Sequence, residues 1–196
     1  MDPLKHSPED PEGWAAPRPG ATLDHTLAIP GSKSLTNREL VLSALAEGTS
    51  TIRGGLLARD TELMIRALEK LGATIRRTGS GETATWTIEP IRFAKLAEGP
   101  LVIDCGLAGT VMRFIPPLAL LGFQPVRFDG DEQAYQRPMS GVIDGLKQLG
   151  AKVDDGGRGT LPFEVYPGGL PSDWHTITID ASASSQFVSA LLLVAP

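Results

Sequence analysis

Apolar and polar positions recur with two periods along this chain, and these periods predict its helices and strands. TELMIRALEKLG (61–72) and GVIDGLKQLG (141–150) carry apolar residues at helical spacing and end at a Leu-Gly pair, as a helix and its C-terminal stop do. TSTIRG (49–54) and PVRFDG (125–130) are short and contain β-branched or aromatic residues, which is typical of strands. The pattern predicts a mixed α/β chain.

The pattern also repeats at a nearly fixed distance. Leu68 and Leu146 occupy matching helix positions 78 residues apart, and Arg59 and Arg137 keep the same separation. A second repeat of the pattern relates NRELVLSALAEG to VMRFIPPLALLG, and a third copy begins at SSQFVSALLLVAP. A fixed period indicates one supersecondary unit that is used several times and buries its apolar face against its neighbours.

Each unit is expected to run strand, turn, helix, strand, turn, helix and a closing strand pair, a βαβαββ order. The first unit is predicted to place its strands and helices at 22–29, 38–48, 49–54, 61–72, 73–77 and 84–90. The second is predicted to place them at 101–109, 111–122, 125–130, 141–150, 151–155 and 161–167. The third, 175–196, stops after its first helix, so the chain is interpreted as about two and a half units of a longer protein.

The start of the chain differs from the rest. Its first twenty residues contain five prolines and little apolar periodicity. Residues 1–21 are therefore interpreted as a flexible, Pro-rich leader, and the folded domain is expected to cover residues 22–196.

Composition and charge narrow the class of function. The chain is 41% hydrophobic and 21% charged, as ordinary globular proteins are, and its net charge of -5 argues against binding nucleic acid or an acidic membrane surface. Three scattered histidines and the single cysteine, Cys105, show no metal-ligand spacing. No apolar run reaches membrane-spanning length. We expect a cytoplasmic protein without a metal or cofactor, in which any bound anion occupies a local pocket.

Clusters of small polar residues lie at the turn that leads into the first helix of each unit, here called a corner. The three corners are GSKSLTN, GLAGT and SASSQ. Helix N-termini bind anions, because their first N–H groups are unpaired and the helix dipole is positive there. Ser, Thr and Asn also serve as ordinary N-caps, and a single corner would be interpreted that way. Three corners at one period can meet on one side of the domain, which favours a shared anion site.

Lys33 supports this hypothesis. It is predicted to lie in the turn before the first helix, where the dipole disfavours a cation, so a bound phosphate or carboxylate is expected to offset its charge. The alternative is a solvated lysine at the tip of a loop. AIPGSKS lacks the earlier glycine of a nucleotide-binding P-loop, and a nucleotide site is therefore not predicted.

Arginines occupy matching positions at the corners. Arg38 and Arg113 are each expected about one turn inside the first helix of their unit, and Arg137 precedes Pro138, which fits the first position of the next helix. An arginine fork matches the oxygens of a phosphate or carboxylate. Surface ion pairing is the alternative, and it is preferred for Arg66, Arg76 and Arg77.

The second corner adds weaker signals. GLAGT supplies Gly106 and Gly109 at a strand-to-helix turn, where glycine allows a ligand to approach the backbone closely. Cys105 beside them is interpreted as a small buried apolar residue without a catalytic role.

Four motifs, in order, resemble the 5-enolpyruvylshikimate-3-phosphate (EPSP) synthase family: LAIPGSKSLTNRELVLSALAEGTSTIRG, DCGLAGTVMRF, DGDEQAYQRPM and IDASASSQFVSALLLVAP. The resemblance covers about residues 22–196, and DCGLAGTVMRF is most similar to actinobacterial versions. It implies transfer of the enolpyruvyl group of phosphoenolpyruvate to the 5-hydroxyl of shikimate 3-phosphate, in the shikimate pathway, without metal or organic cofactor. It also implies a monomer of six βαβαββ units in two halves, an inside-out α/β barrel, of which this chain is the N-terminal half without the C-terminal domain.

The resemblance also implies roles for individual residues, with Lys33 contacting both substrates and acting in catalysis. Those implied to bind shikimate 3-phosphate are Lys33, Ser34, Arg38, Ser184, Ser185 and Gln186. Those implied to bind phosphoenolpyruvate are Lys33, Gly109, Arg137 and Gln186.

Two positions depart from the pattern of many family members. Leu107 stands where Asn is common, so a polar contact is lost and Leu107 is left out of the predicted site. Phe114 stands where Pro is common, which leaves open the sensitivity to glyphosate, the family's phosphoenolpyruvate-mimicking inhibitor.

Two alternative functions remain at this point. The sister transferase that acts on UDP-N-acetylglucosamine shares the repeated unit, but it pairs Lys with Asn at the first corner and uses a loop cysteine. Here Ser34 follows Lys33, and Cys105 precedes a Gly-rich corner. The other alternative is a non-catalytic phosphate-binding module, because the family's acid–base carboxylates lie in the half that this chain lacks. The chain alone is accordingly expected to be inactive.

Overall fold

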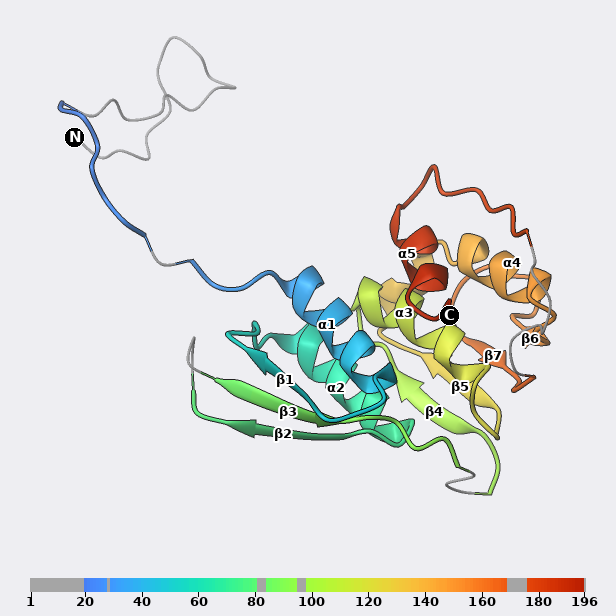
Figure 1. Ribbon diagram of the computed structural model, residues 1–196. Coiled ribbons are helices and arrows are strands. Elements are labelled where there is room, and N and C mark those ends of the chain that lie inside the picture. The colour runs from blue at the N-terminus through green and yellow to red at the C-terminus, as the bar shows by residue number, and fades with distance from the viewer. Residues whose placement is uncertain (1–19, 28, 81–83, 95–97, 169–175, 196) are drawn as a thin grey trace, which may run out of the picture.

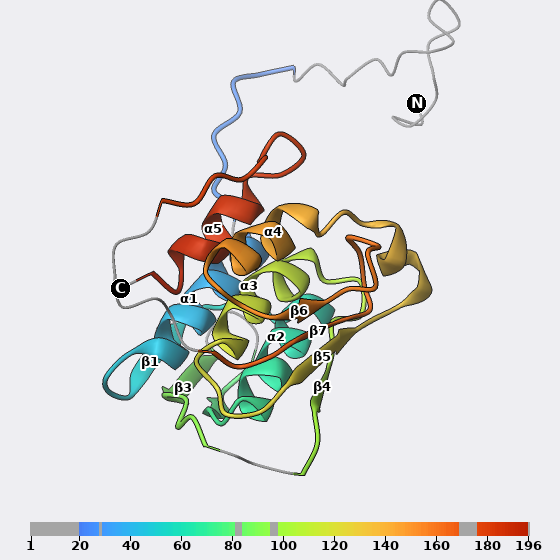
Figure 2. The same cartoon turned by 90° about the vertical axis from the view of Figure 1, so that its right-hand side faces the viewer.

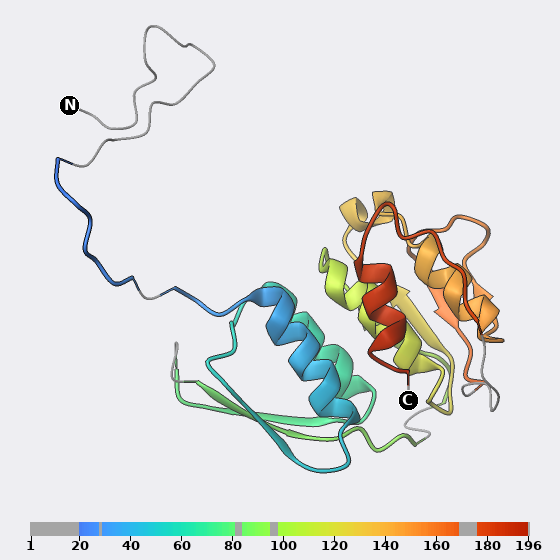
Figure 3. The ribbon, with the colours of Figure 1, turned by 45° about the horizontal axis from the view of Figure 1, so that its top comes forward.

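The computed structural model describes residues 20–27, 29–80, 84–94, 98–168 and 176–195. Within these residues, two β-sheets each carry helices on one face, and the helices of the two sheets pack against one another (Figure 1, Figure 3). The chain therefore has the mixed α/β fold that its sequence pattern predicts.

The first sheet is antiparallel and has the strand order β1-β3-β2. Its central strand alternates half-buried and buried side chains, so that Trp86 and Ile88 point into the core. Helix α1 covers this strand, and α2 packs beside α1. The elements are α1 (Lys33–Leu45), β1 (Ser50–Arg53), α2 (Arg59–Lys70), β2 (Thr74–Thr78) and β3 (Thr85–Glu89).

The second sheet has the order β4-β5-β7-β6, and Figure 2 shows these strands side by side. β4 and β5 are parallel and are joined through a helix, as parallel neighbours require, whereas the other two pairs are antiparallel. The elements are β4 (Leu101–Asp104), α3 (Gly109–Ala119), β5 (Val126–Asp129), the 3-10 helix η2 (Glu132–Gln136), α4 (Ser140–Gln148), β6 (Val153–Asp154), β7 (Phe163–Val165) and α5 (Gln186–Leu192).

Helix α3 lies at the centre of the core. It contacts α1, α2 and α5, and its apolar side chains are buried on all sides, including Val111, Met112, Phe114, Ile115 and Leu118. Leu68 of α2 and Leu146 of α4 are both fully buried, each two positions before the end of its helix. The repeat read from the sequence thus corresponds to equivalent places in the structure.

Helices α4 and α5 approach closely because α4 presents glycines to its neighbour. A methyl group added at Gly141 would lie 2.4 Å from Cδ2 of Phe187, and one added at Gly145 would lie 2.7 Å from Cδ1 of Leu191. Both aromatic and aliphatic side chains of α5 therefore rest directly on the α4 backbone.

Gly141→Ala is expected to lower the free energy of unfolding by about 1–3 kcal/mol, because the added methyl overpacks the contact with Phe187. Helix propensity alone would favour alanine by about 1 kcal/mol, so the predicted loss requires the cost of overpacking to exceed this gain. Urea unfolding followed by circular dichroism measures the difference. Gly48→Ala is the control, since its methyl would meet no atom within 4 Å; equal stability of the two variants would contradict this packing.

Beyond this contact, α5 leaves an apolar face open. The segment before α5 and the outer side of α5 itself enclose a groove of about 430 Å³. The groove is lined by Ile177, Thr178, Ile179, Val188, Leu191 and Leu192. Leu192 is 67% exposed.

Two strand predictions are wrong. Residues 22–27 and 29 lie outside helices and strands, and so do residues 176–180 at the start of the third unit, which was expected to open with a strand. Each segment lacks a partner strand among the described residues, and an extended segment forms a strand only when a neighbour pairs with its N–H and C=O groups. Residues 28 and 175 of these two predictions, and residues 1–19 of the predicted leader, lie outside the described residues.

The starts of two helices also differ from prediction. α1 begins at Lys33 instead of residue 38, because the Ser32 side chain accepts a hydrogen bond from Leu35 N–H and caps the helix there. α4 begins at Ser140, so Pro138 precedes the helix instead of opening it. The remaining helices and strands of the first two units, and α5, are confirmed.

Candidate functional site

The N-terminal ends of four helices border one pocket of about 450 Å³. α1, α2, α3 and α5 each contribute their first residues, and the segment before α4 contributes Arg137. Four lining side chains are cationic and one is a carboxylate, which gives the pocket an excess of positive charge. The lining residues are Lys33, Ser34, Arg59, Asp60, Leu107, Gly109, Thr110, Arg113, Arg137 and Gln186.

The three sequence corners therefore meet, as the repeat predicted. Of the residues predicted for the site, the pocket brings together Lys33, Ser34, Gly109, Arg137 and Gln186. Unpaired N–H groups and helix dipoles converge on the same space. The arrangement suits a small ligand that carries several negative charges.

Several polar residues of the PGSKSLTNR stretch build the corner instead of lining the pocket. Thr36 Oγ1 donates to the Ser32 carbonyl at 2.9 Å and accepts from Leu56 N–H at 3.1 Å. Asn37 is fully buried and donates from Nδ2 to Thr110 Oγ1 at 2.6 Å, which ties α1 to α3. These bonds fix the backbone from which Lys33 and Ser34 face the pocket.

Lys33 opens α1 and forms an ion pair with Asp60, at 2.9 Å between Nζ and Oδ2. Asp60 lies in the first turn of α2, where a carboxylate is favourable. The negative partner expected for Lys33 is therefore supplied by the chain itself. The lysine side chain is 47% exposed, and pairs at that exposure contribute at most about 1 kcal/mol, so a ligand can compete for it.

Gly109 lies where three polar side chains from different segments meet. A methyl group added there would lie 3.0 Å from Arg113 Nη1, 3.3 Å from Arg137 Nη1 and 3.6 Å from Gln186 Oε1. The Arg137 side chain forms no hydrogen bond or ion pair with any residue in the described ranges. Burial lowers the pKa of Arg113, and the charge of Arg137 lowers it further. The excess positive charge beside an open glycine makes this part of the pocket favourable for an anion.

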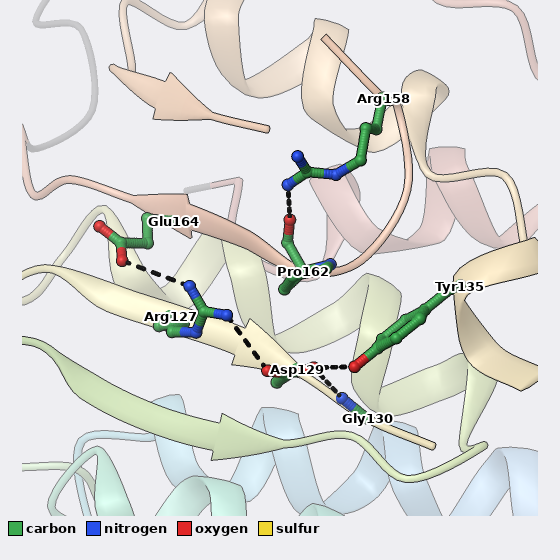
Figure 4. Close-up of polar contacts among 7 residues, drawn as sticks. All are labelled: Arg127, Asp129, Gly130, Tyr135, Arg158, Pro162 and Glu164. Atoms are coloured by element: carbon green, nitrogen blue, oxygen red, sulfur yellow. Dashed lines mark hydrogen bonds and ion pairs between the residues drawn. The ribbon is translucent and has the colours of Figure 1, made fainter. Parts of the chain in front are cut away.

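A hydrogen-bond network at the end of β5 holds η2, the segment that precedes Arg137 (Figure 4). Tyr135 in η2 donates from its hydroxyl to Asp129 Oδ1 at 2.8 Å, and Gly130 N–H donates to the same oxygen at 2.9 Å. Burial raises the pKa of Asp129, but these bonds and Arg127 outweigh it and hold that pKa below its ordinary value. Asp129 stays ionised and anchors the segment that carries Arg137.

Three predicted residues lie outside the pocket lining. Arg38 donates to the Ser34 carbonyl at 3.1 Å and to Ser189 Oγ at 3.3 Å, and its guanidinium lies 5.0 Å from the centre of the Phe114 ring. Ser184 Oγ accepts a hydrogen bond from Gln186 N–H at 3.2 Å, and Ser185 precedes α5 as its N-cap residue. All three adjoin residues of the pocket through α1 or α5.

Five of the lining residues were not among the predicted site residues, although Arg113 had been noted as the equivalent of Arg38. They are Arg59, Asp60, Leu107, Thr110 and Arg113. Arg59 and Arg113 carried a usable signal, because each is the repeat partner of a predicted site arginine. Leu107 was excluded because it lost a polar contact, yet its side chain still borders the pocket and makes that wall apolar.

Cys105 is fully buried, and burial followed by the nearby charges of Asp104 and Asp129 raises the pKa of its thiol. The interpretation of Cys105 as a buried apolar residue is confirmed. Since the thiolate is the reactive form, the thiol is expected to resist iodoacetamide at mildly alkaline pH until the protein is unfolded in urea. Mass spectrometry of the two samples is the measurement, and rapid alkylation of the native protein would contradict it.

In the part of the chain that the structure describes, no three His, Cys, Asp or Glu side chains are grouped so that they could hold a metal ion. No helix among these residues is long and apolar enough to span a membrane. Fold and pocket together define an α/β protein with a cationic pocket at the N-termini of its helices.

Comparison with known proteins identifies the family. The family model for EPSP synthase (3-phosphoshikimate 1-carboxyvinyltransferase) matches residues 17–196. The 3-phosphoshikimate 1-carboxyvinyltransferase of Kocuria rhizophila is 52% identical over 98% of this chain and 43% of that protein, and that of Mycobacterium ulcerans is 50% identical over 93% of this chain and 41% of that protein. A solved structure of EPSP synthase from Acinetobacter baumannii superposes with a TM-score of 0.70 at 25% identity, over 85% of this chain and 37% of that one. The chain belongs to the EPSP synthase family.

The family assignment agrees with the resemblance inferred from the four motifs. The chain spans about two fifths of the length of the curated relatives it matches.

Proposed function

We propose that the longer protein containing this chain transfers the enolpyruvyl group of phosphoenolpyruvate to the 5-hydroxyl of shikimate 3-phosphate and releases phosphate. The observation that carries this proposal is the pocket in which Lys33, Arg113 and Arg137 lie beside the N-termini of four helices. Both proposed substrates carry phosphate and carboxylate groups, which would repel each other strongly without such cations.

In this proposal, Lys33 contacts both substrates and stabilises charge that develops during addition. A fixed cation in a site that excludes water stabilises a transition state without reorganising when the charge appears. Gly109, Arg137 and Gln186 hold phosphoenolpyruvate, because they surround the part of the pocket with two arginines and an open backbone. Ser34, Arg38, Ser184, Ser185 and Gln186 hold shikimate 3-phosphate.

The proposal extends to the fold of the longer protein. The second sheet and its helices contain one complete βαβαββ unit, from β4 to β7. We infer that 22–196 is the N-terminal domain, that its third unit continues beyond residue 196, and that a C-terminal domain completes the inside-out α/β barrel. The protein acts in the cytoplasm as a monomer on small molecules, and this chain alone binds substrate without turning it over.

A thermal melt of this chain tests the proposal, with and without shikimate 3-phosphate and with UDP-N-acetylglucosamine as the control. Ligand that binds only the folded state adds about 2.7 kcal/mol of stability at a hundredfold excess over Kd. A shift with shikimate 3-phosphate alone supports the proposal. A shift with UDP-N-acetylglucosamine alone would assign the chain to the sister transferase reaction, and the buried position of Cys105 argues against that outcome.

A further inference from the structure

The Gln186 side chain is oriented by a single contact. Arg113 of α3 donates from Nη1 to Gln186 Oε1 at 2.7 Å, and Gln186 is the first residue of α5. A guanidinium has only donors, so the carboxamide must turn its oxygen toward Arg113. Its Nε2 group then points away from Arg113, and within the described ranges it forms no hydrogen bond.

Arg113 is itself held in place from several sides. Its guanidinium carbon lies 5.2 Å from the centre of the Phe187 ring, and its Nε is buried without a hydrogen-bond partner. Arg137 Nη1 lies near the same position beside Gly109, at 3.3 Å from a methyl group added there. An arginine packed in this way has little freedom to rotate, so the orientation that it gives to Gln186 is fixed before any ligand arrives.

We propose that Arg113 is a positioning residue, which holds Gln186 Oε1 on the Gly109 side of the carboxamide and so presents Nε2 to the pocket as a hydrogen-bond donor for an anionic ligand. The identity of that ligand rests on the proposed function, but the orientation is a property of the free chain. Arg113 thereby also connects the second repeat unit to the helix that begins the third, because its contact crosses from α3 to α5.

The orientation is tested on the free chain by nuclear magnetic resonance of the Gln186 Nε2 protons, assigned by their loss in Gln186→Met. In Arg113→Met these signals are expected to move to the positions of a solvent-exposed glutamine side chain. Arg66→Met is the control, since Arg66 is an exposed arginine on α2 that pairs with Glu62. Signals that stay in place in Arg113→Met would overturn the proposal. If Arg113→Met does not fold, Arg113→Lys, which lacks the planar fork, is expected to move the same signals in the same direction.

The consequence for binding is tested with inorganic phosphate as the probe. Arg113→Met and Gln186→Met are each expected to weaken phosphate binding roughly tenfold, because each deprives the anion of the same donor, the oriented Nε2–H of Gln186. If Arg113 acts only through Gln186, the double variant should bind phosphate with the same affinity as the single variant that binds it less tightly. Fully additive losses, roughly a hundredfold, would show that Arg113 acts on the anion directly and would overturn the positioning role. If phosphate does not bind the unaltered chain, the proposed function is in question while the resonance comparison still decides the orientation.

Discussion

Lys33→Met in the longer protein is expected to lower kcat/KM by about 10²–10³, while the fold remains intact. Removal of one preorganised electrostatic group at a reacting centre has an effect of that size. Lys33 opens α1 at the edge of the pocket, and among the residues that the structure describes its ion-pair partner is Asp60, through a partly exposed ion pair. Loss of such a pair costs at most about 1 kcal/mol of stability. Catalysis and stability should therefore respond very differently.

Steady-state kinetics and a thermal melt of the same variant separate these two effects. Lys152→Met is the matched control, because Lys152 is an exposed lysine whose ammonium lies over the Tyr166 ring, away from the pocket lining. It makes the same change in net charge. A near-normal rate for Lys33→Met would remove Lys33 from the mechanism, and an equal loss in both variants would indicate that net charge is responsible.

Gly109→Ala is the substitution with the second largest expected effect. Its methyl would enter the space shared by Arg113 and Arg137, at 3.0 and 3.3 Å from their Nη1 atoms. Either these side chains move, which disturbs Arg137 and the Gln186 carboxamide that Arg113 orients, or the ligand loses the space beside Gly109. A charge-assisted hydrogen bond contributes about 1.5–3 kcal/mol, so we expect the KM for phosphoenolpyruvate in the longer protein to rise at least roughly tenfold.

Stability should not fall in Gly109→Ala, which distinguishes a blocked site from a damaged fold. Gly109 does not have a left-handed backbone, and alanine is favoured over glycine in a helix by about 1 kcal/mol. Gly48→Ala, whose methyl meets nothing within 4 Å, is the control for a methyl added elsewhere. An unchanged KM with Gly109→Ala would show that the ligand does not use this space.

The elements that the sequence predicted well are those whose pattern is local. Helix α2 and the strands of its hairpin follow from apolar spacing within a few residues, and they form where expected. The segments 22–29 and 175–180 alternate in the same way, but a strand also needs a partner, which alternation alone does not supply. The early start of α1 was missed because the turn-like composition of its first residues hid the Ser32 cap.

For the site, the repeat predicted which corners meet, but it did not predict contacts across the pocket. Gly109, Arg137 and Gln186 were expected near one ligand, and they do surround one space. The pairing of Lys33 with Asp60 depends on how α1 and α2 are placed relative to each other, and no local pattern encodes that. Arg113 was recognised as an equivalent of Arg38, but its contact with Gln186 appears only once α3 and α5 are packed together.

The open groove beside α5 affects which method can follow the thermal unfolding of this chain. Fluorescent dyes used in common melting assays bind exposed apolar surface, and this groove offers such a surface in the native state. The dye signal would therefore be high before heating and would mask the transition. Of the three tryptophans of the chain, Trp86 is fully buried in the first sheet, and its fluorescence emission changes when the core around it opens.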